Sequence, residues 1–95
     1  MDLQATFDKH SDEYIKFERI AYPRHTRPDL CAFLLLHDLG GGNVRDMVSA
    51  AEHDEIWLDA DPDAVAAKAT EDDIVTLIRC GVRYDAENDS FCMFV

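Results

Sequence analysis

Glycine, proline and cysteine are scarce in this chain of 95 residues, which contains 4 Gly, 3 Pro and 3 Cys. So few glycines and prolines, together with 47% hydrophobic residues, exclude a low-complexity chain and favour a compact core. Three cysteines without clustered spacing do not build a disulfide framework, so buried, reduced thiols are expected. The length predicts one domain that spans residues 1–95.

Long apolar runs are also missing. The longest unbroken run, residues 30–36, has seven residues, far short of the ~20 that a membrane-spanning helix needs. The N-terminus lacks the basic and then apolar pattern of a signal peptide. These two absences predict a protein without a membrane segment and with a cytoplasmic location.

Positive charge is in short supply, with 9 Lys and Arg against 20 Asp and Glu and a net charge of −11. Residues 1–27 hold five bases and five acids, so residues 28–95 carry four bases, fifteen acids and the whole excess. Nucleic acids and anionic membranes bind through Lys and Arg, so this charge disfavours both and favours a protein partner. A solvated surface explains the same acidity without any partner.

The first predicted helix follows Ser11, which is suited to cap a helix whose first turn is acidic. Tyr14 and Phe17 then recur at helical spacing until Pro23 stops the segment. The short stretch from Pro23 to Arg27 is predicted to be a basic linker.

A second helix is predicted around the apolar run at residues 30–36. Thr26 and Asp29 form a capping signature, and Pro28 lies where a helix tolerates proline. The run is apolar on every side, so this helix should be central and buried. A buried strand is the alternative for so short a run, but the flanking caps favour helix. The glycines at 40–42 end it.

The second half of the chain predicts several elements in quick succession. In chain order they are a helix over 43–51, a short strand over 55–58, a helix over 61–69, a helix over 71–80 and paired strands over 82–84 and 91–95. Pro62 and a capping box of Thr70 with Asp73 mark the starts of the second and third helices. Gly81 marks the end of the third.

This order of helix, strand, helix, helix and hairpin resembles the winged helix, a relative of the helix-turn-helix family. The resemblance covers residues 44–95, and the aliphatic stretch 74–82 is similar to the family's usual ending before the wing. It implies a mostly helical α+β fold with a winged-helix-like core at 44–95 and a helical extension at 1–43, which the family often uses for oligomer contacts. It also implies that the helix over 71–80 occupies the DNA-reading position.

The residue types at that position disfavour DNA. A helix that reads DNA presents Arg, Lys, Asn or Gln near its start, whereas this one presents carboxylates, which phosphates repel. The wing tip repeats the pattern. The predicted acidic face of the third helix and wing consists of Glu71, Asp72, Asp73, Asp85, Glu87 and Asp89.

Aromatic and arginine side chains gather near the N-terminus, and this composition is typical of interface hot spots. The candidate partner-binding residues are Tyr14, Phe17, Arg19, Tyr22, Arg24 and Arg27. Docking of this segment on its own domain is the other explanation. If both hold, the charge asymmetry favours a homodimer in which the neutral arm meets the acidic body of its neighbour.

No motif predicts catalysis, a metal or a cofactor. The four histidines lack the paired spacing of zinc ligands, and the acidic repeat at 59–63 lacks the Gly and Glu that a calcium loop needs. The sequence therefore predicts a non-catalytic protein-interaction or regulatory module without a cofactor. One alternative is a DNA-binding transcriptional regulator that uses the basic cluster of Arg19, Arg24 and Arg27. A small metal-binding protein or enzyme, whose His and acids converge in the fold, is the third hypothesis.

Overall fold

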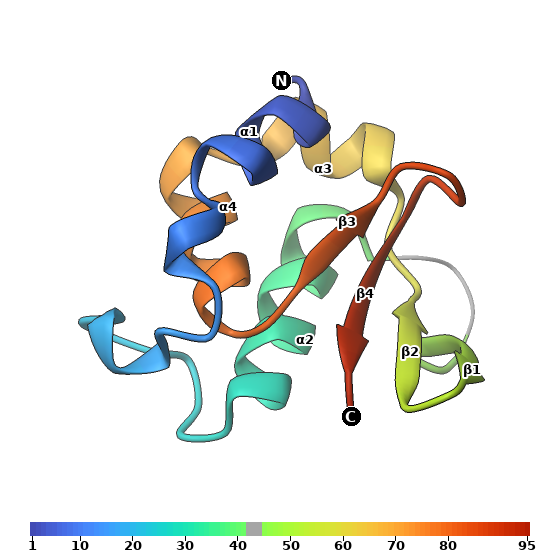
Figure 1. Cartoon of the computed structure of the whole chain (residues 1–95), viewed down its shortest axis with the longest axis horizontal. Helices are drawn as coiled ribbons and strands as arrows, with labels where there is room; N and C mark the ends of the chain where they lie inside the picture. The colour runs from blue at the N-terminus through green and yellow to red at the C-terminus, as the bar shows by residue number, and fades with distance from the viewer. Residues whose placement is uncertain (42–44) are drawn as a thin grey trace.

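The computed structural model describes residues 1–41 and 45–95, with helices on one side of a small sheet (Figure 1). The helical elements are α1 (Leu3–Lys9), the 3₁₀ turns η1 (Ser11–Glu13) and η2 (Phe17–Arg19), α2 (Pro28–Gly40), α3 (Pro62–Lys68) and α4 (Glu71–Arg79). The strands are β1 (Val48–Glu52), β2 (Glu55–Leu58), β3 (Arg83–Asp85) and β4 (Ser90–Phe94). The α+β class predicted from the sequence is confirmed.

The four strands form one antiparallel sheet in the order β1-β2-β4-β3. β2 pairs with β4, so that Ile56 lies opposite Met93 and Leu58 lies opposite Phe91. Leu58, Phe91 and Met93 are buried and join the core that the helices contribute to. β1 lies at one edge of the sheet, and all five of its residues are exposed.

α2 supplies the centre of the core. Its residues Cys31, Ala32, Leu35, Leu36 and Leu39 are all buried. The helix begins with Pro28 in its first turn and ends at Gly40 with Gly41 as its C-cap, as the sequence predicts. The strand alternative for this run is therefore wrong.

The cap expected at the start of α2 is also wrong. Arg27, and not Thr26, is the N-cap residue, and no side chain caps the helix. Asp29 instead accepts a hydrogen bond from the N–H of Leu30 at 2.9 Å. Pro28 removes one of the N–H groups that a cap would satisfy, so this start depends less on a capping side chain.

The second half from β2 onward follows the sequence prediction closely. Asp61 caps α3 through the N–H of Asp63, and the capping box of Thr70 and Asp73 is present at the start of α4. Gly81 follows α4 with a φ of +98°. The N–H of Gly81 donates to Ile78 and that of the next residue to Leu77, which is the Schellman arrangement.

The helix predicted between Ser11 and Pro23 is wrong. Two short 3₁₀ turns occupy this stretch, and Ile15 between them has a φ of 56°, a left-handed conformation that is costly for a β-branched side chain. The N–H of Ile15 donates to the carbonyl of Ile78 in α4 at 3.1 Å. A tertiary hydrogen bond therefore replaces a helical one. The true α-helix lies earlier, at α1, where Asp2 caps it.

The helix predicted from Asn43 is wrong where the structure describes it, because Val48–Glu52 is the strand β1. Asn43 and Val44 lie outside the described residues. His53 and Asp54 have φ values of 48° and 62°, and this two-residue turn suits the twist of a β-hairpin. The backbone hydrogen bonds to β2 thus outweigh the weak local preference for helix.

The left-handed conformation of Gly81 yields a prediction about stability. Gly81→Ala should lower the free energy of unfolding by about 1–2 kcal/mol, because an L side chain is strained at this φ. Urea denaturation followed by circular dichroism measures the change. Gly81→Asn is the matched control and should cost less, because Asn tolerates this conformation. Equal stability of Gly81→Ala and the natural chain would contradict the Schellman assignment.

Candidate interaction surfaces

The acidic start of α4 is partly neutralised by α1. Glu71 Oε1 accepts hydrogen bonds from Lys9 Nζ at 2.8 Å and from His10 Nε2 at 2.9 Å. These two bonds, that of Lys9 first, lower the pKa of Glu71 to about 2. Asp73 is used in the capping box. Asp72 is exposed, so only one of the three predicted carboxylates is left free of these structural contacts.

Residues 13–19, called here the N-terminal segment, pack against the C-terminal end of α4. Arg79 Nε donates to Glu13 Oε2 at 3.1 Å, and Arg79 also reaches the carbonyl of Arg19 at 3.4 Å. The hydrogen bond from Arg79, with help from Arg19, lowers the pKa of Glu13. Among the residues of α4, only Glu71 and Asp72 are exposed. The strongly exposed part of this helix is therefore limited to its acidic first turn.

The acidic residues of the β3–β4 turn organise the turn itself. Asp85 accepts hydrogen bonds from Asn88 Nδ2 at 2.6 Å and from Trp57 Nε1 at 3.1 Å, and these lower its pKa. Asp89 accepts a hydrogen bond from the Tyr84 hydroxyl at 2.5 Å, which raises the pKa of Tyr84 to about 12. Glu87 is exposed.

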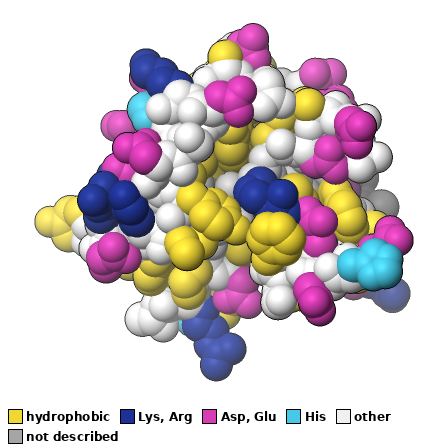
Figure 2. Space-filling view, viewed as in Figure 1, with side chains coloured by type: hydrophobic (Ala, Val, Ile, Leu, Met, Phe, Trp, Pro, Cys, Tyr) yellow, Lys and Arg dark blue, Asp and Glu magenta, His cyan; other side chains and the backbone are white. Residues whose placement is uncertain are grey.

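Acidic side chains are dispersed over the visible face of the molecule. Figure 2 shows them spread around its margin, while hydrophobic side chains gather nearer the middle. The predicted acidic face is therefore a set of separate carboxylates, several of which have structural partners, rather than one continuous patch on this side.

The predicted partner-binding cluster is divided by the fold. Tyr14 and Phe17 are half-buried and pack against the core, and Arg19 donates to Glu13 at 2.8 Å. These three residues attach the N-terminal segment to its own domain. Of these three, Arg19 alone is exposed like the rest of the cluster.

The other three members lie in the exposed loop that leads into α2. Tyr22 is 94% exposed, and Arg24 pairs with Asp38 near the other end of α2. Arg27 is exposed and forms no ion pair within the described parts of the chain. This half of the cluster is accessible to a partner.

An apolar surface on α2 was not anticipated from the sequence. Leu30 and Leu34 are 37% and 45% exposed, although the helix was expected to be buried all round. Beside them, Phe33 and Met47 line a hollow of about 250 Å³ between α2 and the segment before β1. The sequence does contain a sign of this surface. Residues 30–36 are apolar on every side of the helix, and a small domain has few elements with which to cover all of them.

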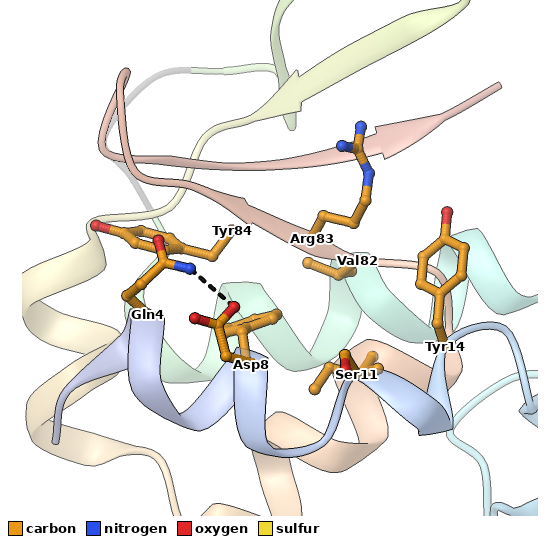
Figure 3. A pocket seen from close by; sticks show the side chains of 9 residues that line it. Gln4, Asp8, Ser11, Tyr14, Val82, Arg83 and Tyr84 are labelled. Atoms are coloured by element: carbon orange, nitrogen blue, oxygen red, sulfur yellow. Dashed lines mark hydrogen bonds between the residues drawn. The ribbon is translucent and has the colours of Figure 1, made fainter.

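A second hollow, of about 290 Å³, lies between α1 and β3 (Figure 3). Its walls are largely the apolar side chains Phe7, Ile78 and Val82. Gln4 donates to Asp8 at 3.0 Å along one wall, and Arg83 points away from α1 (Figure 3). Arg83 instead pairs with Glu55 on β2, so its guanidinium is not directed at Asp8 across the hollow.

The cysteines are not placed for nucleophilic chemistry. Cys31, Cys80 and Cys92 are all buried and free. Burial raises the pKa of Cys80 to about 12, with a further contribution from the neighbouring Cys31 thiol, and burial raises that of Cys92 to about 11. Thiols with such pKa values remain protonated near neutral pH and are poor nucleophiles.

The described residues form neither a cluster of metal ligands nor a membrane-spanning helix. Within 1–41 and 45–95, no group of three His, Cys, Asp or Glu side chains is arranged to hold a metal ion. No helix of these ranges combines the length and apolarity needed to cross a membrane.

The ion pairs of Glu71 predict how stability depends on pH. The pKa is about 2 in the folded state against an ordinary 4.5, so the ionised carboxylate favours folding. This stabilisation is complete above pH 4.5 and is lost as the pH falls toward 2. Glu71→Gln should therefore be less stable than the natural chain at neutral pH, and the difference should vanish in acid.

Urea denaturation at several pH values measures this difference. Asp72→Asn is the matched control, because Asp72 is the exposed neighbour of Glu71, and it should show a smaller dependence on pH. Added salt should also reduce the effect of Glu71→Gln, since the pair is solvent-accessible. A difference that persists unchanged in acid would contradict the assigned ion pairs.

Comparison with known proteins adds no family to this description. No protein-family model matches the chain. No curated protein and no solved structure matches it either.

Proposed function

We propose that this chain is a non-catalytic protein-interaction or regulatory module of winged-helix type that does not bind DNA. The observation that carries the proposal is the covered state of α4. Glu13, Ile15 and Arg19 bond to Ile78 and Arg79 at the C-terminal end of α4, and these contacts would restrict the approach of a duplex to this helix. What remains exposed on this helix is Glu71 and Asp72, and both are acidic.

The order of elements supports the winged-helix part of the proposal. α2, β2, α3, α4 and the β3–β4 hairpin follow one another as helix, strand, helix, helix and wing. β2 pairs with β4, which ties the short strand to the wing. In this arrangement α2 is the first helix of the module, in place of the helix expected over 43–51, and β1 is an addition at the sheet edge.

A DNA-binding regulator is the second candidate, and the arrangement of its arginines disfavours it. Phosphate binding needs Lys or Arg side chains free to replace counterions. Arg19 and Arg24 already pair with Glu13 and Asp38. Arg27 alone cannot offset a net charge of −11.

Titration of a labelled, mixed-sequence DNA duplex tests the proposal by fluorescence anisotropy. At physiological salt the natural chain should leave the anisotropy unchanged at concentrations up to about 10⁻⁴ M, the weak end of non-specific binding. Binding that weakens steeply with salt and is lost in Arg24→Ala and Arg27→Ala would favour the DNA-binding regulator instead.

Charge-reversal variants test the orientation of the module in the same assay. Asp72→Lys with Glu87→Lys should create weak, salt-sensitive binding, because both carboxylates are exposed, one at the start of α4 and one in the β3–β4 turn that would be the wing. Asp46→Lys with Glu52→Lys changes the net charge equally at other exposed positions. Equal gains in both double variants would show that α4 and the wing are not the DNA-facing side, which would overturn the winged-helix assignment.

A further inference from the structure

One side of α2 is apolar and only partly covered by the residues that the structure describes, 1–41 and 45–95. Leu30 and Leu34 are four residues apart, so they lie one above the other on the helix. They are 37% and 45% exposed, whereas Cys31 and Leu35, one residue further along, are buried. A helix that is apolar on every side is normally surrounded. The open side of α2 therefore indicates a surface that a partner covers.

The charge near this surface is unlike that of the rest of the chain. Residues 20–38 contain Arg24 and Arg27 against Asp29 and Asp38, which gives no net charge with histidines neutral, while the whole chain carries −11. The hollow beside the leucines adds Arg45, Asp46 and Asp59. Residues 28–95 outside α2 carry most of the excess of acids, so two copies that approach through them repel each other. At α2 that repulsion is smaller, and Leu30 and Leu34 expose apolar side chains there.

The structure therefore points to a second copy of this chain as the partner, and we infer that two chains pair through antiparallel α2 helices. This inference rests on the proposed protein-interaction function. A two-fold axis near the middle of the helix would bring Leu30 of one chain against Leu34 of the other. In such a two-fold symmetric dimer, both chains use the same patch and make the same contacts.

The ends of the stripe are complementary in charge under the same symmetry. Arg27 lies three residues before Leu30, and Asp38 lies four residues after Leu34. Antiparallel pairing brings Arg27 of one chain near the Asp38 end of the other helix, where it would join the pair that Asp38 forms with Arg24 of its own chain. Figure 1 shows the start of α2 at the bottom of the molecule beside the exposed loop that carries Arg24 and Arg27.

The hollow beside the stripe gives the partner's side chains a place to pack. Phe33, Met47 and His37 line this space of about 250 Å³. Helices associate when side chains of one fill the spaces between side chains of the other. The hollow and the leucine stripe together make a surface with both ridges and a groove.

Sedimentation equilibrium of the full chain over a range of micromolar concentrations tests the inference. The natural chain should have twice the mass of one chain, and added salt should favour the dimer because it screens the repulsion between acidic surfaces. Leu34→Lys should weaken the dimer at least about tenfold, because it places a charge at the centre of the contact. Circular dichroism should show an unchanged fold, since Leu34 is exposed.

Val48→Lys is the matched control, because Val48 on the open edge of β1 is 39% exposed. This variant should remain dimeric. Loss of the dimer in Val48→Lys but not in Leu34→Lys would overturn the inference in favour of pairing through β1.

A charge exchange tests the predicted register. Arg27→Glu should weaken the dimer several-fold, and Arg27→Glu combined with Asp38→Lys should restore it if these ends meet across the axis. Both variants are made in an Arg24→Ala background, because Arg24 pairs with Asp38 within the chain. Failure of the second change to rescue the first would overturn the antiparallel register.

The outcomes for the inference and for the proposed function are separate. A natural chain that is monomeric at every concentration overturns the inference and leaves the DNA titration to decide the proposed function. A natural chain that binds DNA overturns the proposed function, whatever its mass in solution.

Discussion

The docking of the N-terminal segment onto α4 is the contact on which the available surfaces of this protein depend. The N–H of Ile15 donates to Ile78, and Glu13 receives Arg79. Ile15 accepts a left-handed backbone in order to make its bond. Such a conformation persists only where the surrounding contacts hold it, so the segment is a structural part of the domain rather than a loose arm.

The aromatic residues Phe7, Tyr14 and Phe17 near the N-terminus pack within the domain instead of forming a surface for a partner. Phe7 lies 6.1 Å from Tyr84 and from Phe91, measured between ring centroids, and Tyr14 and Phe17 also pack on the core. Aromatic side chains of the kind found in protein–protein interfaces thus form a contact within the chain itself. The surface that stays open lies elsewhere, on α2, because a domain of this size has too few elements to surround its most apolar helix.

The negative charge disfavours polyanionic partners, and it does not form a binding site among the described residues. Glu71, Asp73 and Asp85 each have partners within the domain, and these bonds organise helix starts and a turn. The remaining carboxylates oppose polyanions and oppose a second copy of the chain. Association is therefore favoured where the excess of acids is absent, around Arg27 and the exposed leucines of α2.

The sequence by itself determined α2, α3 and α4, because Pro28, Pro62, Thr70 and Gly81 act on neighbours within a few residues. It also determined β2 and the β3–β4 hairpin, because short apolar runs flank the turn-forming residues 85–90. Only the tertiary structure decided the conformation near Ile15, where the hydrogen-bond partner is 63 residues away in sequence. The same holds for β1, whose ladder with β2 overrode a helical pattern. The tertiary structure also decided which apolar side chains stay exposed. Periodicity shows which residues share a side of a helix, but it does not show how many neighbouring elements cover that side.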